Sequence, residues 1–373
     1  MFRLGVSCGV DLVEIRSFIG RDTLLKRFAL ADSVELANRN LKLEPLKRGR
    51  EWKGVKALPV PLSRAVVLSS AQIGYMSRLG VTDRIVGVGD AKFVVDSAVS
   101  SRITPLEPRA SNLEPVMELG NGSALDYEKL LALKPSLVMT FATGGSEDDY
   151  ARLEALGIPV MLTSEWQEDS PLAKAEWIKL YGKLFCGTAS DSVCEVPADS
   201  IFEQSRKSYE ALRDSLLAGS SPKPRVLAGM VYGGVWYAPG GKSYTAKLIR
   251  DAGGRYLWES DTTREMKLSL EQVLALSDSA DVWINPGVFA SMEEILAAEP
   301  RVKNIKAFRE GRICQNDARK SPGGGNDFYE GAVARPAELL ENVTECLYFE
   351  SSSPKRQKLA PSPYKWYRNI YKL

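Results

Sequence analysis

The chain has 373 residues, of which 44% are hydrophobic and 26% charged, and its 49 lysines and arginines nearly balance its 47 aspartates and glutamates. This length is enough for two hydrophobic cores. The balanced charge argues against a nucleic-acid-binding protein, in which we would expect one strongly basic domain. The sequence contains no histidine, which excludes Ser-His-Asp and Cys-His catalysis, histidine-ligated zinc, iron or haem, and a histidine pH switch.

The first 60 residues are rich in charge and only weakly periodic. The alternation over residues 25–30 is typical of an edge strand, and we expect a peripheral β appendage here. Asp11 interrupts any apolar core of a signal peptide. Cys8, which follows Gly5-Val6-Ser7, has a faint likeness to a lipoprotein cleavage site. We interpret the chain as a mature or truncated form, and its export stays open at this point.

Short apolar strands and helices alternate from residue 65 onward. The sequence predicts a strand over residues 65–68, a helix that ends near Leu79, and a second strand over residues 85–89. The same alternation returns in strands over residues 137–141 and 160–163, with a helix between them. Strands that alternate with helices through short turns predict a parallel sheet with helices on its faces.

A second, similar unit follows further along the chain. The stretches that begin at Asp126 and at Ser269 share a glutamate, a Leu-Ala-Leu run and a serine, and each predicts a helix, a turn and a strand. Their wide spacing fits two similar α/β lobes and does not fit a solenoid repeat; a chance likeness between two amphipathic helices is the alternative. Between them, residues 198–218 carry apolar side chains on one face and predict a single helix of about 30 Å.

We therefore predict an α/β fold with two Rossmann-like lobes, whose mostly parallel sheets are joined by a single long α-helix, and a small N-terminal β appendage. A single long helix is stiff, so we expect little movement of one lobe relative to the other. The predicted segments are residues 1–60 for the peripheral N-terminal segment, 61–194 for the N-terminal lobe, 195–220 for the interlobe helix, 221–350 for the C-terminal lobe and 351–373 for a basic C-terminal tail.

Five cysteines without a Cys-x-x-Cys motif argue against a zinc knuckle and a thioredoxin-like site. Cys186 and Cys194 are close in sequence and either pair in an oxidising compartment or remain buried thiols. The tail beyond Glu350 is basic and is interrupted by prolines, so we expect an extended surface strap. A localisation signal or a patch that binds an anionic surface is the alternative. The sequence has no run of about 18 apolar residues, the length that a membrane-spanning helix needs.

Several stretches of the sequence resemble a known family. They include LDYEKLLALKPSLVM at residues 125–139, GGVWYAPGGKSYTAKLIRDAGGRYLW at residues 233–258 and LSLEQVLALSDSADVWINPG at residues 268–287. From Val66 onward the chain is similar to the periplasmic substrate-binding proteins of ABC importers for cobalamin, iron-siderophores and haem, in which one long helix bridges two lobes. IKAFREGRICQND and GGGNDFYEGAVARP resemble the versions typical of Bacteroidetes-type bacteria.

The resemblance implies a binding protein and not an enzyme. Such a protein holds a metal chelate (a siderophore, a corrinoid or haem) between its lobes and delivers it to the permease of an ABC transporter. It implies a monomer in the periplasm, lipid-anchored in its full-length precursor, with no cofactor and no nucleic-acid partner.

In this family one glutamate on each lobe pairs with arginines of the permease. The resemblance places the first at Glu147, just after a Gly-Gly turn, although an acid in the first helical turn is also explained by the helix dipole. The second corresponds to Glu293 or Glu294. Because Ser291 and Glu294 form a predicted capping box, Glu294 would be occupied locally, and we select Glu293.

Ligand contacts are expected from loops at the carboxyl ends of the strands. Aromatic rings there can stack on a flat chelate, and lysines can form ion pairs with its carboxylate or phosphate groups. Each aromatic residue alone is almost as well explained as part of the core, but three of them stand beside glycine-rich turns. The candidate ligand-binding residues are Ser70, Trp166, Trp236, Tyr237, Lys242, Tyr244, Lys320 and Asn326.

The identity of the chelate stays open. Ala142 and Thr143 stand near the position where cobalamin binders tend to carry tryptophan, which argues against cobalamin. No arginine cluster suits an anionic siderophore, and without histidine haem could be held only by tyrosine or by stacking. Alternatives are a metal chelatase on the same fold, for which no catalytic cluster is evident, and a haem-binding storage or sensor protein. A Rossmann oxidoreductase is disfavoured because no Gly-x-Gly-x-x-Gly joins a strand to a helix.

Overall fold

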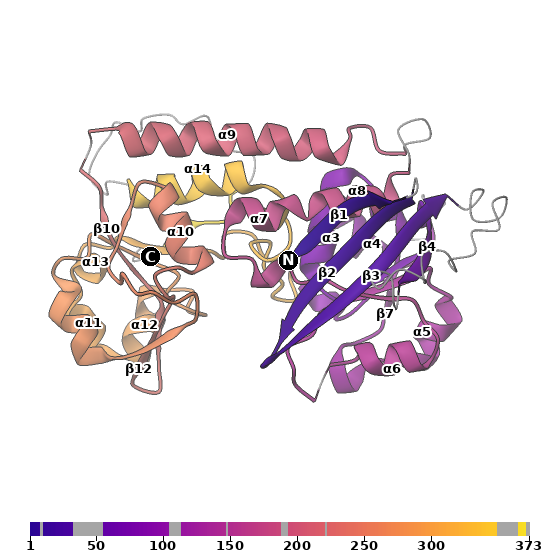
Figure 1. The fold of residues 1–373 in the computed structure, drawn as a ribbon. Helices are drawn as coiled ribbons and strands as arrows, with labels where there is room; N and C mark the ends of the chain where they lie inside the picture. Colours follow the sequence, from indigo (N-terminus) through magenta and orange to yellow (C-terminus); the bar gives the residue numbers. More distant parts are fainter. Residues whose placement is uncertain are drawn as a thin grey trace. The chain divides into compact units, whose positions relative to one another are not determined.

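We describe the chain in a computed structural model that forms two compact units (Figure 1). Each unit is described by itself. Unit 1 comprises residues 1–168, 173–203 and 321–334, and unit 2 comprises residues 169–172, 204–320 and 335–373. The structure describes residues 1–7, 10–32, 55–103, 113–146, 148–187, 193–220, 222–348 and 365–370. Among the helices in these ranges, none has the length and apolar character needed to cross a membrane.

A five-stranded parallel sheet forms the centre of unit 1. The strand order is β7-β6-β5-β8-β9. The chain adds β6 and β7 on one side of β5 and then β8 and β9 on the other side, so the order of the strands reverses at β5 while all strands stay parallel. All residues of β5, β6, β8 and β9 are buried, as expected for a parallel sheet covered on both faces. The strands are β5 (Ala65–Val67), β6 (Ile85–Val88), β7 (Met117–Glu118), β8 (Leu137–Thr140) and β9 (Val160–Leu162).

Helices cover the two faces of this sheet as the predicted alternation requires. Side chains of α3 (Ser70–Leu79), α4 (Ser97–Ile103) and α8 (Ile178–Phe185) belong to one hydrophobic cluster. Side chains of α5 (Tyr127–Leu133) and α6 (Tyr150–Ala155) belong to another. Successive residues of β5 alternate between these clusters, because side chains along a strand point to opposite faces of the sheet. The short helix α7 (Pro171–Glu176) precedes α8.

The N-terminal segment forms a β-sheet, as predicted, and its four strands pack against the core of unit 1. The order is β1-β2-β3-β4, antiparallel except for the parallel pair β3 and β4. The inward side chains of these strands share the cluster of α3 and α8, and the Phe2 ring lies 4.9 Å from the Trp177 ring. Figure 1 shows these strands in indigo. Their bounds are β1 (Phe2–Ser7), β2 (Val10–Ile19), β3 (Asp22–Asp32) and β4 (Lys56–Val60).

Unit 2 contains a second sheet of mostly parallel strands, in the order β13-β10-β15-β16-β17. A smaller antiparallel sheet, β11-β12-β14, accompanies it. The strands are β10 (Arg225–Ala228), β11 (Met230–Tyr232), β12 (Val235–Ala238), β13 (Arg255–Tyr256), β14 (Met266–Ser269), β15 (Val282–Ile284), β16 (Ile313–Gln315) and β17 (Arg368–Asn369). The helices are α10 (Tyr244–Asp251), α11 (Leu270–Ser277), α12 (Met292–Ala298), α13 (Lys306–Arg309) and α14 (Pro336–Leu347).

The long helix predicted over residues 198–218 is α9 (Ala198–Ala218), and the division between the units falls within it. A predicted boundary differs further along the chain. Residues 321–334, expected in the C-terminal lobe, belong to unit 1. Gly74 in α3 permits their close approach, because a Cβ atom there would lie 1.8 Å from the Glu330 carbonyl oxygen.

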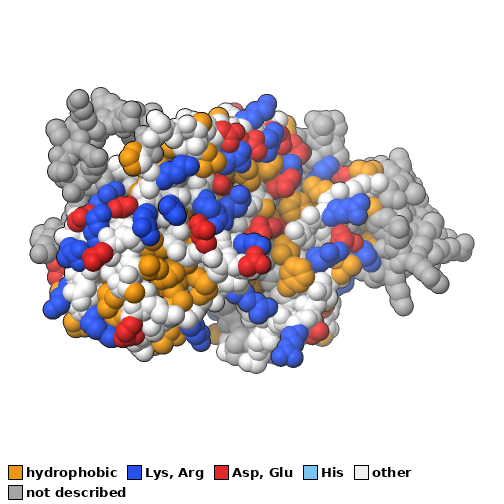
Figure 2. Space-filling view, turned by 60° about the vertical axis from the view of Figure 1, so that its left-hand side comes forward, with side chains coloured by type: hydrophobic (Ala, Val, Ile, Leu, Met, Phe, Trp, Pro, Cys, Tyr) orange, Lys and Arg blue, Asp and Glu red, His pale blue; other side chains and the backbone are white. Residues whose placement is uncertain are grey.

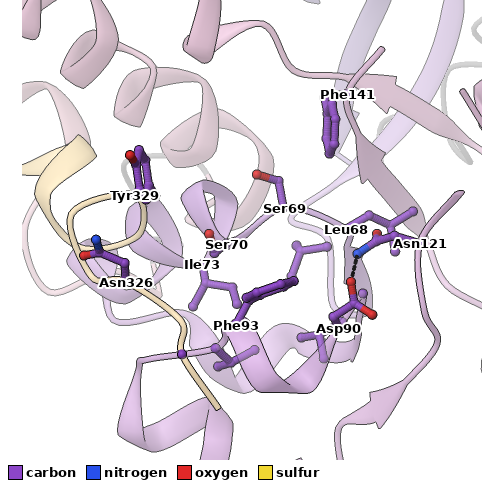
Figure 3. Close-up of a pocket in the computed structure, with 15 residues that line it drawn as sticks. Leu68, Ser69, Ser70, Ile73, Asp90, Phe93, Asn121, Phe141, Asn326 and Tyr329 are labelled. Carbon is purple, nitrogen blue, oxygen red and sulfur yellow. Dashed lines mark hydrogen bonds between the residues drawn. The ribbon is translucent and has the colours of Figure 1, made fainter. Parts of the chain in front are cut away.

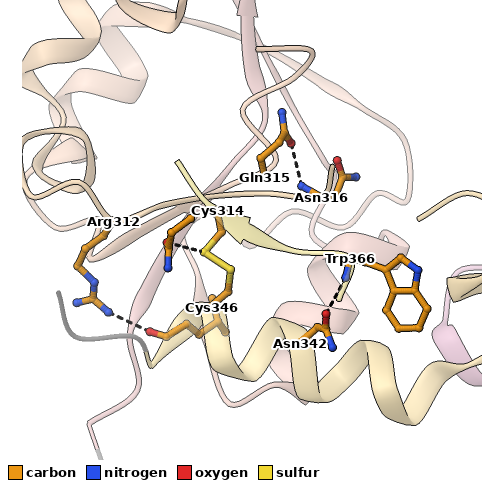
Figure 4. Close-up of a disulfide and its surroundings, with 9 residues drawn as sticks. Arg312, Cys314, Gln315, Asn316, Asn342, Cys346 and Trp366 are labelled. Carbon is orange, nitrogen blue, oxygen red and sulfur yellow. Dashed lines mark hydrogen bonds between the residues drawn. A yellow bond between two sulfur atoms is a disulfide. The ribbon is translucent and has the colours of Figure 1, made fainter. Parts of the chain in front are cut away.

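The end of the tail is a strand and not a surface strap. β17 pairs with β16 in the sheet of unit 2, and the Trp366 side chain is fully buried. The backbone N–H of Trp366 donates to Asn342 Oδ1 at 2.8 Å (Figure 4). The remaining basic tail and Cys8 lie outside the described residues.

Four of the five cysteines form two disulfides. Cys186 pairs with Cys194 in unit 1, which settles the alternative between pairing and free thiols. Cys314 of β16 pairs with Cys346 of α14 in unit 2 (Figure 4), a bond that the sequence did not suggest. On the face that Figure 2 presents, lysine and arginine side chains are interspersed with aspartate and glutamate side chains and do not form one basic region.

Candidate ligand-binding site

A pocket of about 430 Å³ lies in unit 1, where the order of the parallel strands reverses (Figure 3). Residues at the carboxyl ends of β5, β6 and β8 line it, together with Asn121 after β7 and a segment from residues 321–334. The reversal point of an open α/β sheet is where such folds bind ligands. The lining residues used below are Ser69, Ser70, Asp90, Phe93, Asn121, Phe141, Asn326 and Tyr329.

The first wall of the pocket is the turn from β5 into α3. Ser69 precedes α3 as its N-cap residue, and its backbone N–H donates to the Gln72 Oε1 atom at 3.2 Å. Gln72 is fully buried and donates from Nε2 to the Thr163 hydroxyl at 3.0 Å. The hydrogen bonds of this buried side chain fix the start of α3, and they thereby hold Ser69 and Ser70 in position.

A glycine-rich segment forms the opposite wall. The Ser321 hydroxyl and the Gly325 N–H both donate to the Lys92 carbonyl oxygen, at 2.7 and 3.2 Å. A Cβ atom at Gly323 would lie 2.6 Å from that oxygen, and one at Gly325 would lie 2.3 Å from the Phe93 carbonyl oxygen. The glycines are therefore required for this approach, which brings Asn326 and Tyr329 to the same pocket as Phe93.

Glu330 fastens the glycine-rich segment to the unit. Its side chain is buried, and its two carboxyl oxygens accept hydrogen bonds from the N–H groups of Val95 at 2.9 Å and Asp96 at 2.5 Å. Burial raises the pKa of Glu330 to about 8; the two N–H groups act in the opposite direction, and Asp327 and Asp96 add to the rise in its pKa. The walls formed by Phe93 and Tyr329 are thus joined through one carboxyl group.

Three aromatic rings at the pocket are open to solvent. Phe93 is 47% exposed, Phe141 is 39% exposed and Tyr329 is 58% exposed. None of the three was among the predicted residues. Their positions carried a signal, because Phe141 directly follows a buried strand and Tyr329 stands in the glycine-rich stretch. Rings of this size offer stacking surface to an apolar ligand.

Sequence comparison identifies the family of the chain. A family model described as periplasmic binding protein matches residues 66–319, which is more than half of the chain. The chain belongs to the periplasmic binding protein family. Proteins of this family are binding components of transport systems and not enzymes, so the prediction of a non-enzymatic protein is confirmed.

Individual relatives of this periplasmic binding protein are distant. An uncharacterized lipoprotein of Methanocaldococcus jannaschii, MJ0878, is 21% identical over 304 residues, which cover 79% of this chain and 67% of the relative. A periplasmic binding protein from Veillonella parvula has a TM-score of 0.56 at 16% identity and covers 90% of this chain and 97% of its own.

The periplasmic heme-binding protein HutB of Vibrio cholerae has a TM-score of 0.54 at 18% identity and covers 76% of this chain and 98% of its own. These structures confirm the predicted fold: two α/β units with parallel sheets and an additional N-terminal β-sheet. The comparisons do not support the taxonomic part of the resemblance, a Bacteroidetes-type source.

In this periplasmic binding protein, the predicted ligand residues of unit 1 are only partly brought together. Ser70 and Asn326 line the pocket. Trp166 lies in the turn after β9 and is 47% exposed, but it does not line this pocket.

The prediction that Trp236 contacts a ligand is corrected by its position in unit 2. Its side chain is fully buried, its Nε1–H donates to the Ala228 carbonyl oxygen at 3.2 Å, and its ring lies 5.1 Å from that of Trp283. Trp236 is therefore a core residue. Tyr237, its neighbour on β12, is partly buried, with the Lys267 ammonium 5.7 Å from its ring centroid.

The other predicted residues of unit 2 have local partners. Lys242 forms an ion pair with Asp261. The Lys320 ammonium lies 2.9 Å from Asp317, whose carboxylate also binds Arg368 of β17. Tyr244 begins α10, and burial raises the pKa of its hydroxyl. Arg368, and not Lys320, joins this carboxylate to the C-terminal strand. A role of Tyr237, Lys242, Tyr244 or Lys320 at a ligand stays a prediction.

One predicted docking residue can be placed in the structure. Glu293 is exposed in the first turn of α12, whereas the Glu294 carboxylate accepts a hydrogen bond from the Ala290 N–H at 2.7 Å. Ser291 is the N-cap residue, and its hydroxyl oxygen accepts from the Glu294 N–H at 3.2 Å. Glu294 is thus occupied locally, as expected. Glu147 lies outside the described residues.

Proposed function

We propose that the protein is the substrate-binding component of an ABC uptake system and that it captures a metal chelate, such as an iron-siderophore or a corrinoid. The observation that carries this proposal is the pocket at the strand reversal, with Phe93, Phe141 and Tyr329 exposed beside hydroxyl and amide groups. Large chelates present flat or apolar surfaces with polar groups at their edges, which these side chains match. The membership of the family supports the transport role, and the heme-binding HutB shares the fold.

An extracytoplasmic location forms part of the proposal. Two disulfides favour an oxidising compartment, because such bonds are rare where glutathione and thioredoxin keep thiols reduced. The relative from Methanocaldococcus jannaschii is described as a lipoprotein, which supports a periplasmic or cell-surface protein, lipid-anchored in its precursor.

Tryptophan-fluorescence titration with ferric siderophores, corrinoids and haem tests the binding function. We expect saturable quenching with at least one chelate and no chemical change in it. Tyr329→Ala and Phe93→Ala should each lower the affinity for that chelate about tenfold. Each variant removes one stacking contact, and the lost binding free energy of about 1.4 kcal/mol corresponds to a tenfold change. Phe18→Ala is the matched control, since Phe18 is an equally exposed ring (48%) of unit 1 that does not line the pocket. Absence of quenching by every chelate would refute the proposal.

Docking on a permease is a separate expectation. Glu293→Lys should reduce ATP hydrolysis stimulated by the protein in proteoliposomes of its permease, while the affinity for the chelate stays the same. Exposed carboxylates steer and orient a partner, so the stimulation by the unmodified protein should also weaken as salt is raised. Glu310→Lys makes the same charge change at another exposed position of unit 2. A loss of chelate affinity in Glu293→Lys would instead assign this residue to the ligand site.

A further inference from the structure

The charge of the pocket in unit 1 is carried by one residue. Asp90 is the charged residue that lines the pocket, and no lysine or arginine is found among its lining residues in the described part of the chain. Asn121 Nδ2 donates to Asp90 Oδ2 at 3.0 Å (Figure 3). For Asp90 Oδ1 the described residues provide no hydrogen-bond partner, which leaves this oxygen to accept from a ligand.

Among the residues that the structure describes, Asp90 forms no ion pair with a lysine or arginine. Glu118 lies close by, since its carboxylate accepts from the N–H of Ala91 at 2.9 Å. The nearby cation is Lys92, an exposed residue whose ammonium lies 4.8 Å from the centroid of the Phe93 ring and which does not line the pocket. The pocket therefore offers acceptors and a carboxylate to whatever enters it.

The open rings favour the same ligand charge as the carboxylate does. The face of an aromatic ring is electrically negative, so Phe93, Phe141 and Tyr329 attract cationic or neutral apolar groups and disfavour anions. An anionic chelate would also bring like charges together in a partly desolvated pocket, where their repulsion is stronger than in water. A neutral chelate can form hydrogen bonds through its amide or hydroxamate groups with the side chains of Asn121, Asn326 and the two serines.

We propose that this pocket selects a neutral or cationic metal chelate over an anionic one, and that Asp90 is the residue that determines this selectivity. The inference rests on the proposed function, because it specifies the ligand class of the same site. A cationic chelate would place an ammonium or amide N–H against the open carboxylate oxygen of Asp90, while its apolar body contacts the rings of Phe93 and Tyr329.

Chelates that differ in one charge test this assignment. Ferrioxamine B carries a free ammonium, whereas its N-acetylated form is neutral and otherwise the same; ferric enterobactin and haem are anionic. We expect the unmodified protein to bind ferrioxamine B about tenfold more tightly than the acetylated form, a difference of about 1.4 kcal/mol in binding free energy. It should bind the two anionic chelates more weakly than either ferrioxamine. The preference should shrink as ionic strength rises.

Asp90→Asn should bring the ratio of affinities for the two ferrioxamines close to one, because the amide keeps an acceptor for Asn121 but carries no charge. Asp90→Ser is a second variant for the case that the first does not fold, and Asp83→Asn in the same unit should retain the full preference. Tightest binding of an anionic chelate, or an unchanged pattern across the panel in Asp90→Asn, would overturn the assignment but leave a chelate-binding protein. Absence of saturable binding by every chelate would remove the proposed function itself.

Discussion

Replacing Cys314 and Cys346 together by alanine should lower the free energy of unfolding of unit 2 by about 4 kcal/mol. The two residues are 32 positions apart, so their disulfide removes much of the freedom that this stretch would have in the unfolded chain. The bond joins β16 to α14. Within the sheet, β16 lies between β15 and β17 and pairs with β17. Loss of the disulfide should therefore also loosen the C-terminal strand.

The second disulfide provides the matched control. Cys186 and Cys194 are only 8 positions apart, and the same entropy argument gives a smaller loss of about 2.5 kcal/mol for their double alanine variant. Urea unfolding measures both free energies, and hydrogen exchange at residues 313–315 and 368–369 reports on the strand pair. Equal losses in the two variants, or unchanged exchange at β17, would contradict this explanation.

The stability of unit 1 should decrease as pH rises from about 5 to about 8, and Glu330→Gln should remove this part of the decrease. Burial raises the pKa of Glu330 to about 8 from its usual 4.5. Between these values the folded protein holds a proton that the unfolded chain has released, so stability is present at low pH and is lost as pH passes the folded pKa. One such group contributes a slope of up to about 1.4 kcal/mol per pH unit.

The comparison of the two proteins isolates this residue. Urea unfolding of unmodified protein and Glu330→Gln at a series of pH values gives two curves whose difference reports Glu330 alone. Glu310→Gln, at an exposed position, should reproduce the unmodified curve. Once the intrinsic rise of amide exchange with pH is divided out, the protection of residues 321–331 should fall with pH in the unmodified protein only, because ionised Glu330 is the form that burial penalises. Parallel curves for the unmodified protein and Glu330→Gln would show that this carboxyl does not set the pH dependence.

The elements predicted correctly are those whose signal is local. The run from Ala65 to Val67 is apolar throughout, and α9 repeats its apolar side chains at helical spacing over its whole length. The N-terminal strands were also anticipated, but the side chains that they pack against were not. Alternation shows that Val13 and Ile15 share one face of a strand, yet it does not tell that the helices covering this face lie more than 50 residues further along the chain.

The site was predicted in part for a similar reason. Ser70 and Asn326, which line the pocket, follow a strand and a glycine run, and both of these signals are local. Trp236 was misplaced although the period of two along β12 held the answer, since Trp236 and Ala238 are both buried and Tyr237 between them is not. An aromatic residue suits a core and a binding surface equally well, so the residue type alone does not separate Trp236 from Tyr329.

Unit 1 is assembled from three separate stretches of the chain, and the last of them ends at residue 334. During translation, therefore, the ribosome must make most of the 373 residues before this unit can be completed. Until then α3 lacks the segment that packs against Gly74. The hydrogen bonds from the N–H groups of Val95 and Asp96 to the carboxyl group of Glu330 have not yet formed either. The nascent protein can form its first sheet early, but it gains the complete pocket only near the end of its synthesis.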